Sequence, residues 1–334
     1  MKKILIATIL FFSTTALANN NIIDESPDIQ WFKDSFGDIK EDVEEAKNSN
    51  KRLMLYFYQH SCPYCRLFQN ETLSDTDASH KIRKLFDVVK INMWGDKEIS
   101  DMQGIETTEK EFSLELGVQY TPTLLLFNEE GKVVMRINGY YPKKKILKAV
   151  DHIGNKKEKT LSFRKFYNME MESNTTPENK SQDINLKNIF DPKHNDNFYK
   201  PLMVIFENNN CDYCNTLHED ILKREAVSLA LSNFNLLIID TNSKDKIINF
   251  NGSTLQIDEW ISKLKIETEP TIVFFDSYGK EIIRAASELQ TYHFHSLMDY
   301  VSTKAYKSIP NYQRFLQHRR KNLRGRGHII EMMK

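Results

Sequence analysis

The sequence has little glycine, little proline and no net charge. Its 334 residues include 11 Gly and 9 Pro, which excludes collagen-like and Pro/Gly-rich low-complexity chains. Lys plus Arg equals Asp plus Glu at 46 each, so the chain has no overall field that would attract nucleic acid. Four cysteines are too few for a disulfide-stapled scaffold. With 40% hydrophobic residues, the chain has enough apolar material for about two ordinary domains.

Long hydrophobic runs are also missing, apart from a short one at the N-terminus. Two lysines precede an apolar run at 4–12, and the small residues Ala16 and Ala18 follow it. This pattern is typical of a signal peptide over residues 1–18, and the run is too short to span a membrane. We therefore expect cleavage after Ala18, a mature chain with no transmembrane span, and a periplasmic location, where disulfides persist.

The chain contains an internal duplication of domain size. Segments 53–65 and 202–214 match at an offset of 149 residues, and segments 116–123 and 264–271 match at an offset of 148. This period is far longer than that of solenoid repeats, so each copy is a domain. We divide the sequence into a signal peptide (1–18), a first domain (19–155), a polar linker (156–195), a second domain (196–304) and a basic C-terminal helical tail (305–334).

Each copy predicts strands that alternate with helices. The first copy predicts helices at 38–48, at 66–73 and from a capping box at 108–111 to residue 116, and strands at 53–58, 86–93, 123–127 and 133–137. The order β-α-β-α-β-β, with crossover helices, predicts a three-layer α/β sandwich.

The C-terminal tail is rich in basic residues. Residues 311–326 carry six Lys and Arg and no acid, and apolar residues recur there at roughly helical spacing. This favours a helix with one solvated basic face; a nucleic-acid patch and an anionic-membrane patch are the alternatives. Because the patch lies at one end of a neutral chain, we expect the solvated face and no nucleic-acid partner.

A Cys-x-x-Cys pair stands in each copy where a buried strand meets a helix. Unpaired N–H groups and the positive end of the helix dipole stabilise a thiolate on the first cysteine of such a pair. We predict Cys62 and Cys211 as nucleophiles in dithiol–disulfide exchange and Cys65 and Cys214 as the resolving thiols, with no cofactor and no metal.

A proline precedes an apolar strand in each copy, 60 or 59 residues after the first cysteine. A cis proline there would present extended backbone to a substrate strand beside the sulfur. The predicted substrate contacts are these prolines, the residues before them and the tyrosines inside the cysteine pairs: Pro122, Thr121, Pro270, Glu269, Tyr64 and Tyr213.

Three other interpretations of the cysteines compete. One zinc bound by all four is disfavoured because the pairs lie 149 residues apart, far more than zinc-ribbon spacing. Attachment of c-type haem needs a histidine after the pair, whereas Arg66 and Asn215 stand there. Inert structural disulfides have the same local form and stay open as an alternative, more so for the second pair.

Two residues near the first pair have both a functional and a plain interpretation. His60, two residues before Cys62, would favour the thiolate as an imidazolium, or is an ordinary loop residue. Trp94 is interpreted as core or loop packing in preference to a recognition surface.

The two pairs are predicted to differ in acidity. Asp212 stands where the first pair has Pro63, and its carboxylate disfavours a thiolate on Cys211; Glu269 adds to this effect. We predict a higher pKa for Cys211 than for Cys62 and a more negative potential for the second pair.

The first copy resembles the SoxW-type periplasmic thioredoxins, and both copies resemble the thioredoxin fold. The resemblance rests on segments 55–65, 91–96, 121–127 and 139–142; it covers 28–153 well and 197–304 plus the tail more loosely. It implies two tandem thioredoxin-like three-layer α/β sandwiches, with Cys62, Cys65 and Pro122 as the site. It departs from the family at Tyr56 and Ile205, where cytoplasmic thioredoxins hold a buried aspartate.

The resemblance implies an exported thiol-disulfide oxidoreductase that reduces disulfides in periplasmic proteins. Its expected partners are disulfide-bearing exported proteins and, as electron donor, a membrane thiol transporter of the CcdA/DsbD kind. A disulfide isomerase or oxidase is one alternative, since two sites per chain would suit isomerisation. A redox-inert binding or chaperone scaffold is the other, although a scaffold has no need for paired cysteines and prolines in both copies.

Overall fold

The computed structural model describes residues 27, 29–170, 184–191, 193–209, 211–328 and 330. The predicted signal peptide and the most polar part of the predicted linker lie outside the described residues. Within the described ranges no helix combines the length and the apolar character needed to cross a bilayer.

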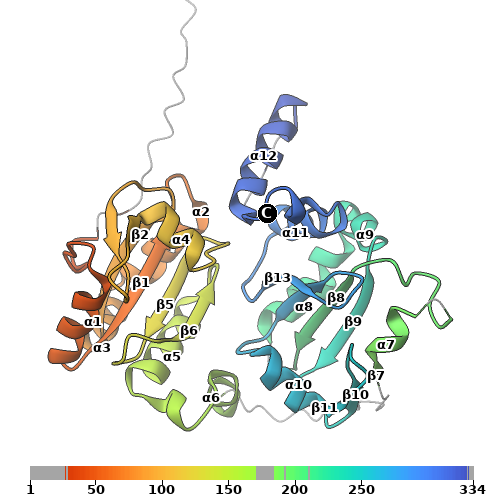
Figure 1. Ribbon diagram of the computed structural model, residues 1–334, viewed down its shortest axis with the longest axis horizontal. Coiled ribbons are helices and arrows are strands. Elements are labelled where there is room, and N and C mark those ends of the chain that lie inside the picture. The colour runs from red at the N-terminus through yellow and green to blue at the C-terminus, as the bar shows by residue number, and fades with distance from the viewer. Residues whose placement is uncertain are drawn as a thin grey trace, which may run out of the picture.

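The first domain is built on a four-stranded sheet of order β2-β1-β5-β6 (Figure 1). The central strand β1 runs parallel to β2 and antiparallel to β5, which pairs antiparallel with β6. The strands are β1 (Arg52–Tyr58), β2 (Phe86–Asn92), β5 (Thr123–Phe127) and β6 (Val133–Asn138), with a separate hairpin of β3 (Glu98–Ser100) and β4 (Glu106–Thr108). The helices are α1 (Ile39–Asn48), α2 (Pro63–Phe68), α3 (Thr76–Leu85), α4 (Glu109–Glu115) and α5 (Lys143–Gly154), with a π-helical turn η1 (Gln69–Leu73) and a 3-10 turn η2 (Lys157–Lys159).

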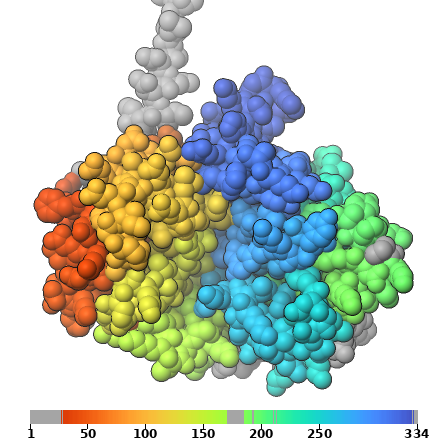
Figure 2. All heavy atoms as spheres, viewed as in Figure 1, coloured from red at the N-terminus to blue at the C-terminus, as the bar shows by residue number. Residues whose placement is uncertain are grey.

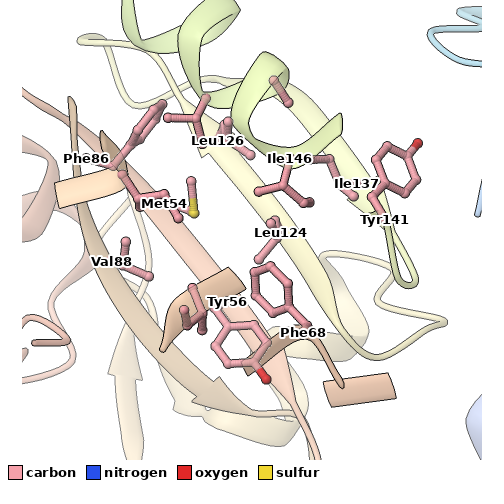
Figure 3. Close-up of a cluster of buried hydrophobic side chains, with 14 of the residues drawn as sticks. Met54, Tyr56, Phe68, Phe86, Val88, Leu124, Leu126, Ile137, Tyr141 and Ile146 are labelled. Atoms are coloured by element: carbon pink, nitrogen blue, oxygen red, sulfur yellow. The ribbon is translucent and has the colours of Figure 1, made fainter. Parts of the chain in front are cut away.

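Both faces of this sheet are covered, as the almost wholly apolar β1 predicts. Met54 and Tyr56 point to one face, where α2, α3 and α5 close a core that includes Phe68 and Ile146 (Figure 3). The alternate residues of β1 point to the other face, which α1 and α4 cover, and Leu55 packs there. The predicted three-layer sandwich is confirmed.

The helix after the first cysteine pair begins earlier than the sequence analysis expects. α2 starts at Pro63, directly after Cys62, because the Cys62 sulfur caps its first turn and proline suits the first helical position. The capping box at Thr108 and Glu111 is present as predicted. Helices α3 and α5 and the β3–β4 hairpin were not predicted from the sequence.

The second domain repeats this plan with a sheet of order β13-β12-β8-β9. Its sheet strands are β8 (Leu202–Glu207), β9 (Asn235–Asp240), β12 (Thr271–Phe275) and β13 (Glu281–Ala285). A smaller sheet holds β7 (Ile184–Asn185), β10 (Lys246–Ile248) and β11 (Thr254–Gln256). The helices are α7 (Leu186–Ile189), α8 (Asp212–Glu219), α9 (Glu225–Leu231), α10 (Ile257–Leu264), α11 (Thr291–Ser302) and α12 (Tyr312–Gly325), with 3-10 turns η3 (Ile221–Lys223) and η4 (Ala305–Lys307).

Two segments tie the domains together. Helix α6 (Phe163–Glu170), inside the segment assigned to the linker, buries Phe163 and Phe166 in the core of the first domain. Arg164 of the same helix reaches the second domain, where it pairs with Asp258 at 2.7 Å. The second segment is α12, which packs on the second domain and also contacts the loop between α4 and β5 of the first domain (Figures 1 and 2).

Candidate active sites

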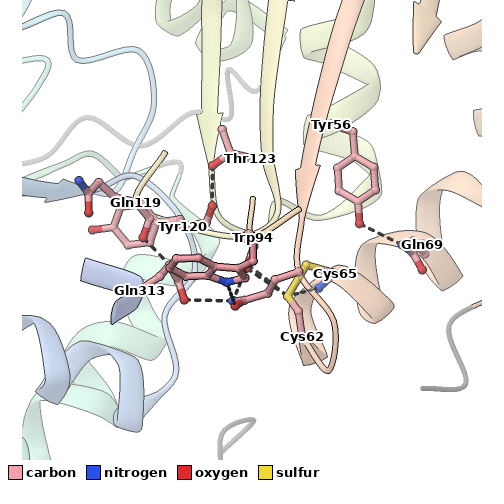
Figure 4. The surroundings of a disulfide bond; sticks show 11 residues. Tyr56, Cys62, Cys65, Gln69, Trp94, Gln119, Tyr120, Thr123 and Gln313 are labelled. Atoms are coloured by element: carbon pink, nitrogen blue, oxygen red, sulfur yellow. Dashed lines mark hydrogen bonds between the residues drawn. A yellow bond between two sulfur atoms is a disulfide. The ribbon is translucent and has the colours of Figure 1, made fainter. Parts of the chain in front are cut away.

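The first cysteine pair sits at the N-terminus of α2, beyond the end of β1. Cys62 and Cys65 form a disulfide, and the Cys62 sulfur accepts the Cys65 backbone N–H at 3.1 Å (Figure 4). Cys62 is 8% exposed and Cys65 is 2% exposed. The Cys62 sulfur therefore caps the helix N-terminus and accepts a backbone N–H there, and the Cys65 sulfur is the more shielded, as dithiol–disulfide exchange requires.

A proline loop lies directly beside this disulfide. The Thr121–Pro122 peptide bond is cis, and the Cys62 sulfur lies 3.5 Å from the Thr121 carbonyl oxygen and 3.4 Å from its hydroxyl. The two residues are 59 and 60 positions from Cys62 in the chain, so only the fold brings them together. Thr121 thus contacts the sulfur next to the cis bond, whereas the role of Thr121 and Pro122 in binding substrate stays a prediction.

The second pair has the same local construction. Cys211 and Cys214 form a disulfide at the N-terminus of α8, and the Cys211 sulfur accepts the Cys214 N–H at 3.2 Å. The Glu269–Pro270 bond is also cis, and both residues line one pocket with Cys211. The four cysteines therefore pair within their own domains and do not form one four-cysteine cluster. Among the described residues, no group of three or more His, Cys, Asp or Glu side chains is placed to hold a metal ion.

The first site opens into a cavity that the second domain helps to build. Its walls include Gln59, His60 and Tyr64 from the first domain and Leu289, His293, Tyr312 and Arg320 from the second. The Tyr64 hydroxyl accepts the backbone N–H of Gln290 at 3.3 Å, and the Tyr64 ring meets His293 edge to face at 5.1 Å. Burial raises the pKa of Tyr64 to about 12, so its hydroxyl stays protonated.

Helix α12 attaches to the proline loop of the first site. The Tyr312 backbone N–H donates to the Gln119 side chain at 2.6 Å, and the Gln313 amide donates to the Gln119 carbonyl at 3.2 Å. Tyr120, next in the loop, is only 6% exposed because it packs into the core of the second domain. Its hydroxyl donates to the Arg284 carbonyl at 2.8 Å.

The second site is covered by the first domain in turn. Lys145 of α5 donates to the Thr268 hydroxyl at 2.8 Å and to the Glu269 carbonyl at 3.0 Å. The Tyr141 hydroxyl donates to the Thr268 hydroxyl at 3.4 Å. The backbone before Pro270 is therefore already in contact with the first domain.

Glu269 points away from this contact into a buried polar cluster. Its carboxylate accepts the Thr241 hydroxyl at 2.8 Å and lies 3.9 Å from the Arg164 guanidinium. Burial raises the pKa of Glu269. Asp212 begins α8, but its side chain is outside what the structure describes. The predicted acidity difference between the two cysteine pairs therefore stays a prediction.

Position 56, where the sequence departs from the cytoplasmic thioredoxins it resembles, holds a tyrosine in a polar contact. Tyr56 is 1% exposed, and its hydroxyl accepts the Gln69 amide at 3.0 Å close to Cys65 (Figure 4). The corresponding Ile205 in the second domain is fully buried. A polar hydroxyl at this position is thus present in the first domain and absent from the second.

The other residues singled out in the sequence have plain structural settings. The Trp94 indole N–H donates to Gln59 at 2.9 Å, and the Arg314 guanidinium lies 5.8 Å from the indole ring, so Trp94 packs between the first site and α12 (Figure 4). His60 is exposed at the mouth of the cavity. Sequence reasoning missed Lys145, His293, Tyr120 and Gln313, whose only signal is that Lys145 and His293 share one register position of the repeat.

The comparisons with known proteins agree with this architecture. The Thioredoxin-like domain family matches residues 39–154 and 193–302. The chain belongs to this family. No curated protein matches the chain.

Solved structures resemble single thioredoxin-like domains of this chain. A thioredoxin-fold protein from Helicobacter pylori is 22% identical, with 42% of this chain and 86% of that chain covered and a TM-score of 0.34. A thioredoxin from Thermus thermophilus is 25% identical, with 34% and 81% covered and a TM-score of 0.28. A disulphide isomerase from Xylella fastidiosa is 19% identical, with 39% and 84% covered and a TM-score of 0.23.

Proposed function

We propose that this protein is an exported thiol-disulfide oxidoreductase that reduces disulfides in periplasmic proteins, as a SoxW-type thioredoxin. One observation carries the proposal: in each domain a cysteine pair caps a helix N-terminus beside a cis proline. A thiolate at such a helix N-terminus is stabilised, and at the first site the backbone beside it can hold an extended peptide, which supports the proposal. The N-terminal pattern at 1–18 supports export.

In the reduction, the Cys62 thiolate attacks one sulfur of a client disulfide. A mixed disulfide forms, and the second client sulfur leaves as a thiolate. Cys65 then loses its proton and attacks the Cys62 sulfur, which forms the Cys62–Cys65 disulfide and releases the client's other sulfur. The client gains two electrons, and the oxidised pair needs a dithiol donor, for which we propose a membrane transporter of the CcdA/DsbD kind.

The decisive experiment compares two activities of the mature chain. We expect reduction of insulin disulfides by dithiothreitol to accelerate, and refolding of scrambled ribonuclease to stay near its uncatalysed rate. Faster ribonuclease refolding without insulin reduction would instead assign an isomerase. If neither rate changes and a Cys62→Ser variant behaves like the unmodified protein, the chain is a redox-inert scaffold.

Trapping identifies the clients. A Cys65→Ser variant keeps the attacking thiol but cannot resolve the mixed disulfide, so it should accumulate covalent partners in periplasmic extracts. The matched Cys62→Ser variant should capture none, because the attacking sulfur is gone. Equal capture by both variants would contradict the assignment of Cys62 as nucleophile.

A further inference from the structure

A lysine of the first domain lies in the active site of the second. Lys145 stands on the first turn of α5, and its side chain lines one pocket with Cys211 and Pro270. Its ammonium is fixed by the Thr268 hydroxyl and the Glu269 carbonyl, the two groups that precede Pro270. The Tyr141 and Tyr167 rings hold the same ammonium at 4.5 and 5.7 Å from their centroids.

Among the described residues that line this pocket, Lys145 is the lysine whose ammonium is bound to the backbone before Pro270. Glu269 turns its carboxylate toward Thr241 and Arg164, and the exposed Lys144 stands at the rim. Glu288 lines both this pocket and the cavity at Cys62. Among the residues whose side chains the structure describes, the other titratable groups lining this pocket are the hydroxyls of Tyr141, Tyr167 and Tyr213.

We propose that Lys145 supplies, across the domain boundary, the positive charge that stabilises the Cys211 thiolate. A positive charge near a thiol favours its ionised form, and the low-dielectric setting between two domains strengthens the attraction. Burial lowers the pKa of Lys145 to about 8, whereas the carboxylates of Glu269 and Glu288 act to raise it, so the ammonium already responds to negative charge near this pocket. The inference rests on the proposed function for the role of Cys211 as attacking thiol.

The repeat explains how this arrangement arises. Lys145 and His293 occupy the same position of the two equivalent helices α5 and α11. His293 lines the cavity at Cys62, just as Lys145 lines the pocket at Cys211. Each domain therefore contributes the third residue of this helix to the other domain's active site. That residue is a lysine at the Cys211 site and a histidine at the Cys62 site.

The test measures the acidity of Cys211 in the full chain. A Cys62→Ser/Cys65→Ser/Cys214→Ser background leaves Cys211 as the only thiol, and its pKa follows from thiolate absorbance and from the pH dependence of iodoacetamide alkylation. In this background Lys145→Gln keeps a donor for the two oxygens but removes the charge. We expect it to raise the Cys211 pKa by about one unit, which slows alkylation about tenfold below the pKa. Lys145→Arg should restore the original value, and Lys148→Gln on the same helix should leave it unchanged.

A second measurement leaves Lys145 in place and is independent of whether the glutamine variant folds. Because the coupling between two charges is reciprocal, replacing Cys211 by Ser in the same background should lower the Lys145 pKa measured by NMR. An unchanged Cys211 pKa in folded Lys145→Gln protein, or an unchanged Lys145 pKa without Cys211, would overturn the proposal. Neither titration depends on turnover, so loss of insulin reduction would contradict the proposed function without affecting this inference.

Discussion

The two active sites share their local geometry and differ in what the other domain places in front of them. At the first site, the second domain forms the far wall of a cavity next to Cys62. At the second site, the first domain places Lys145 on the backbone before Pro270. The comparison teaches that the cysteine pair sets the chemistry of such a site, whereas the neighbouring domain sets its access and its charge.

The interface also uses the two proline loops unequally. Tyr120 of the first loop enters the core of the second domain, whereas the equivalent Thr268 only binds polar groups of the first domain. The first domain has a further feature without a counterpart: Arg52, which is 2% exposed, binds Glu129 at 2.8 Å, and Pro201 takes the place of the arginine in the second repeat. The repeats have thus kept the sheet and the cysteines and diverged in the contacts around them.

The largest expected effect is the loss of insulin reduction when the nucleophile of the first site, and not that of the second, is replaced. Cys62→Ser should reduce insulin reduction to the uncatalysed rate, since a serine hydroxyl is not ionised at neutral pH. Cys211→Ser should leave most of the activity, because Lys145 already occupies the loop beside that cysteine. Equal losses in the two variants would show that both sites serve the same clients.

The next effect is a loss of stability when Tyr120, which the first proline loop buries in the second domain, is truncated. Tyr120→Ala should cost about 3–5 kcal/mol of stability, because it removes a buried aromatic ring and its hydrogen bond to Arg284. Thermal unfolding and limited proteolysis would measure the loss and any separation of the domains. Tyr278→Ala is the matched control, since Tyr278 is 89% exposed, and it should change little.

The ion pair between Arg52 and Glu129 predicts that the stability of the first domain depends on pH. Burial acts to raise the pKa of Glu129, but hydrogen bonds from Lys156 and Arg52 outweigh it and lower the pKa to about 2. The folded pKa lies below the unfolded value, so this stabilisation is complete above about pH 4.5 and is lost as the pH falls toward 2. We expect Glu129→Gln to cost about 2 kcal/mol at pH 7 and almost nothing at pH 2. Chemical unfolding at both pH values measures this, and a loss that does not depend on pH would assign the effect to packing.

The smallest effect concerns the acidity of the two nucleophiles. With all other cysteines replaced by serine, the pKa of Cys211 should exceed that of Cys62 by roughly one unit, because Asp212 stands where the first pair has Pro63. Thiolate absorbance titration of the two single-cysteine proteins measures the difference. Lys145→Gln should widen it, since the lysine opposes the carboxylate. Equal values, or a lower pKa for Cys211, would contradict the prediction.

Much of each domain could be predicted from the sequence because the determining patterns are local. The apolar run at 53–58 correctly predicted the central strand β1, and the capping box at Thr108 correctly predicted the start of α4. The position of Cys62 at a helix N-terminus was predicted correctly, whereas the first helical residue was placed at Arg66, three residues after the observed start at Pro63. Helix α5 was not predicted, although it carries Lys145, which lines the pocket of the second site.

By itself the sequence determined the duplication, the succession of the main strands along the first copy and the two cysteine pairs, because these follow from periodicity and from spacing along one segment. Only the tertiary structure decided that the repeats place their active sites against each other. Lys145 lies 66 residues from Cys211 in the chain, and Gln313 lies 254 residues from Gln59, yet the fold brings each into the other domain's site. Contacts between residues so far apart depend on the shape and side chains of two finished domain surfaces, which no local pattern encodes.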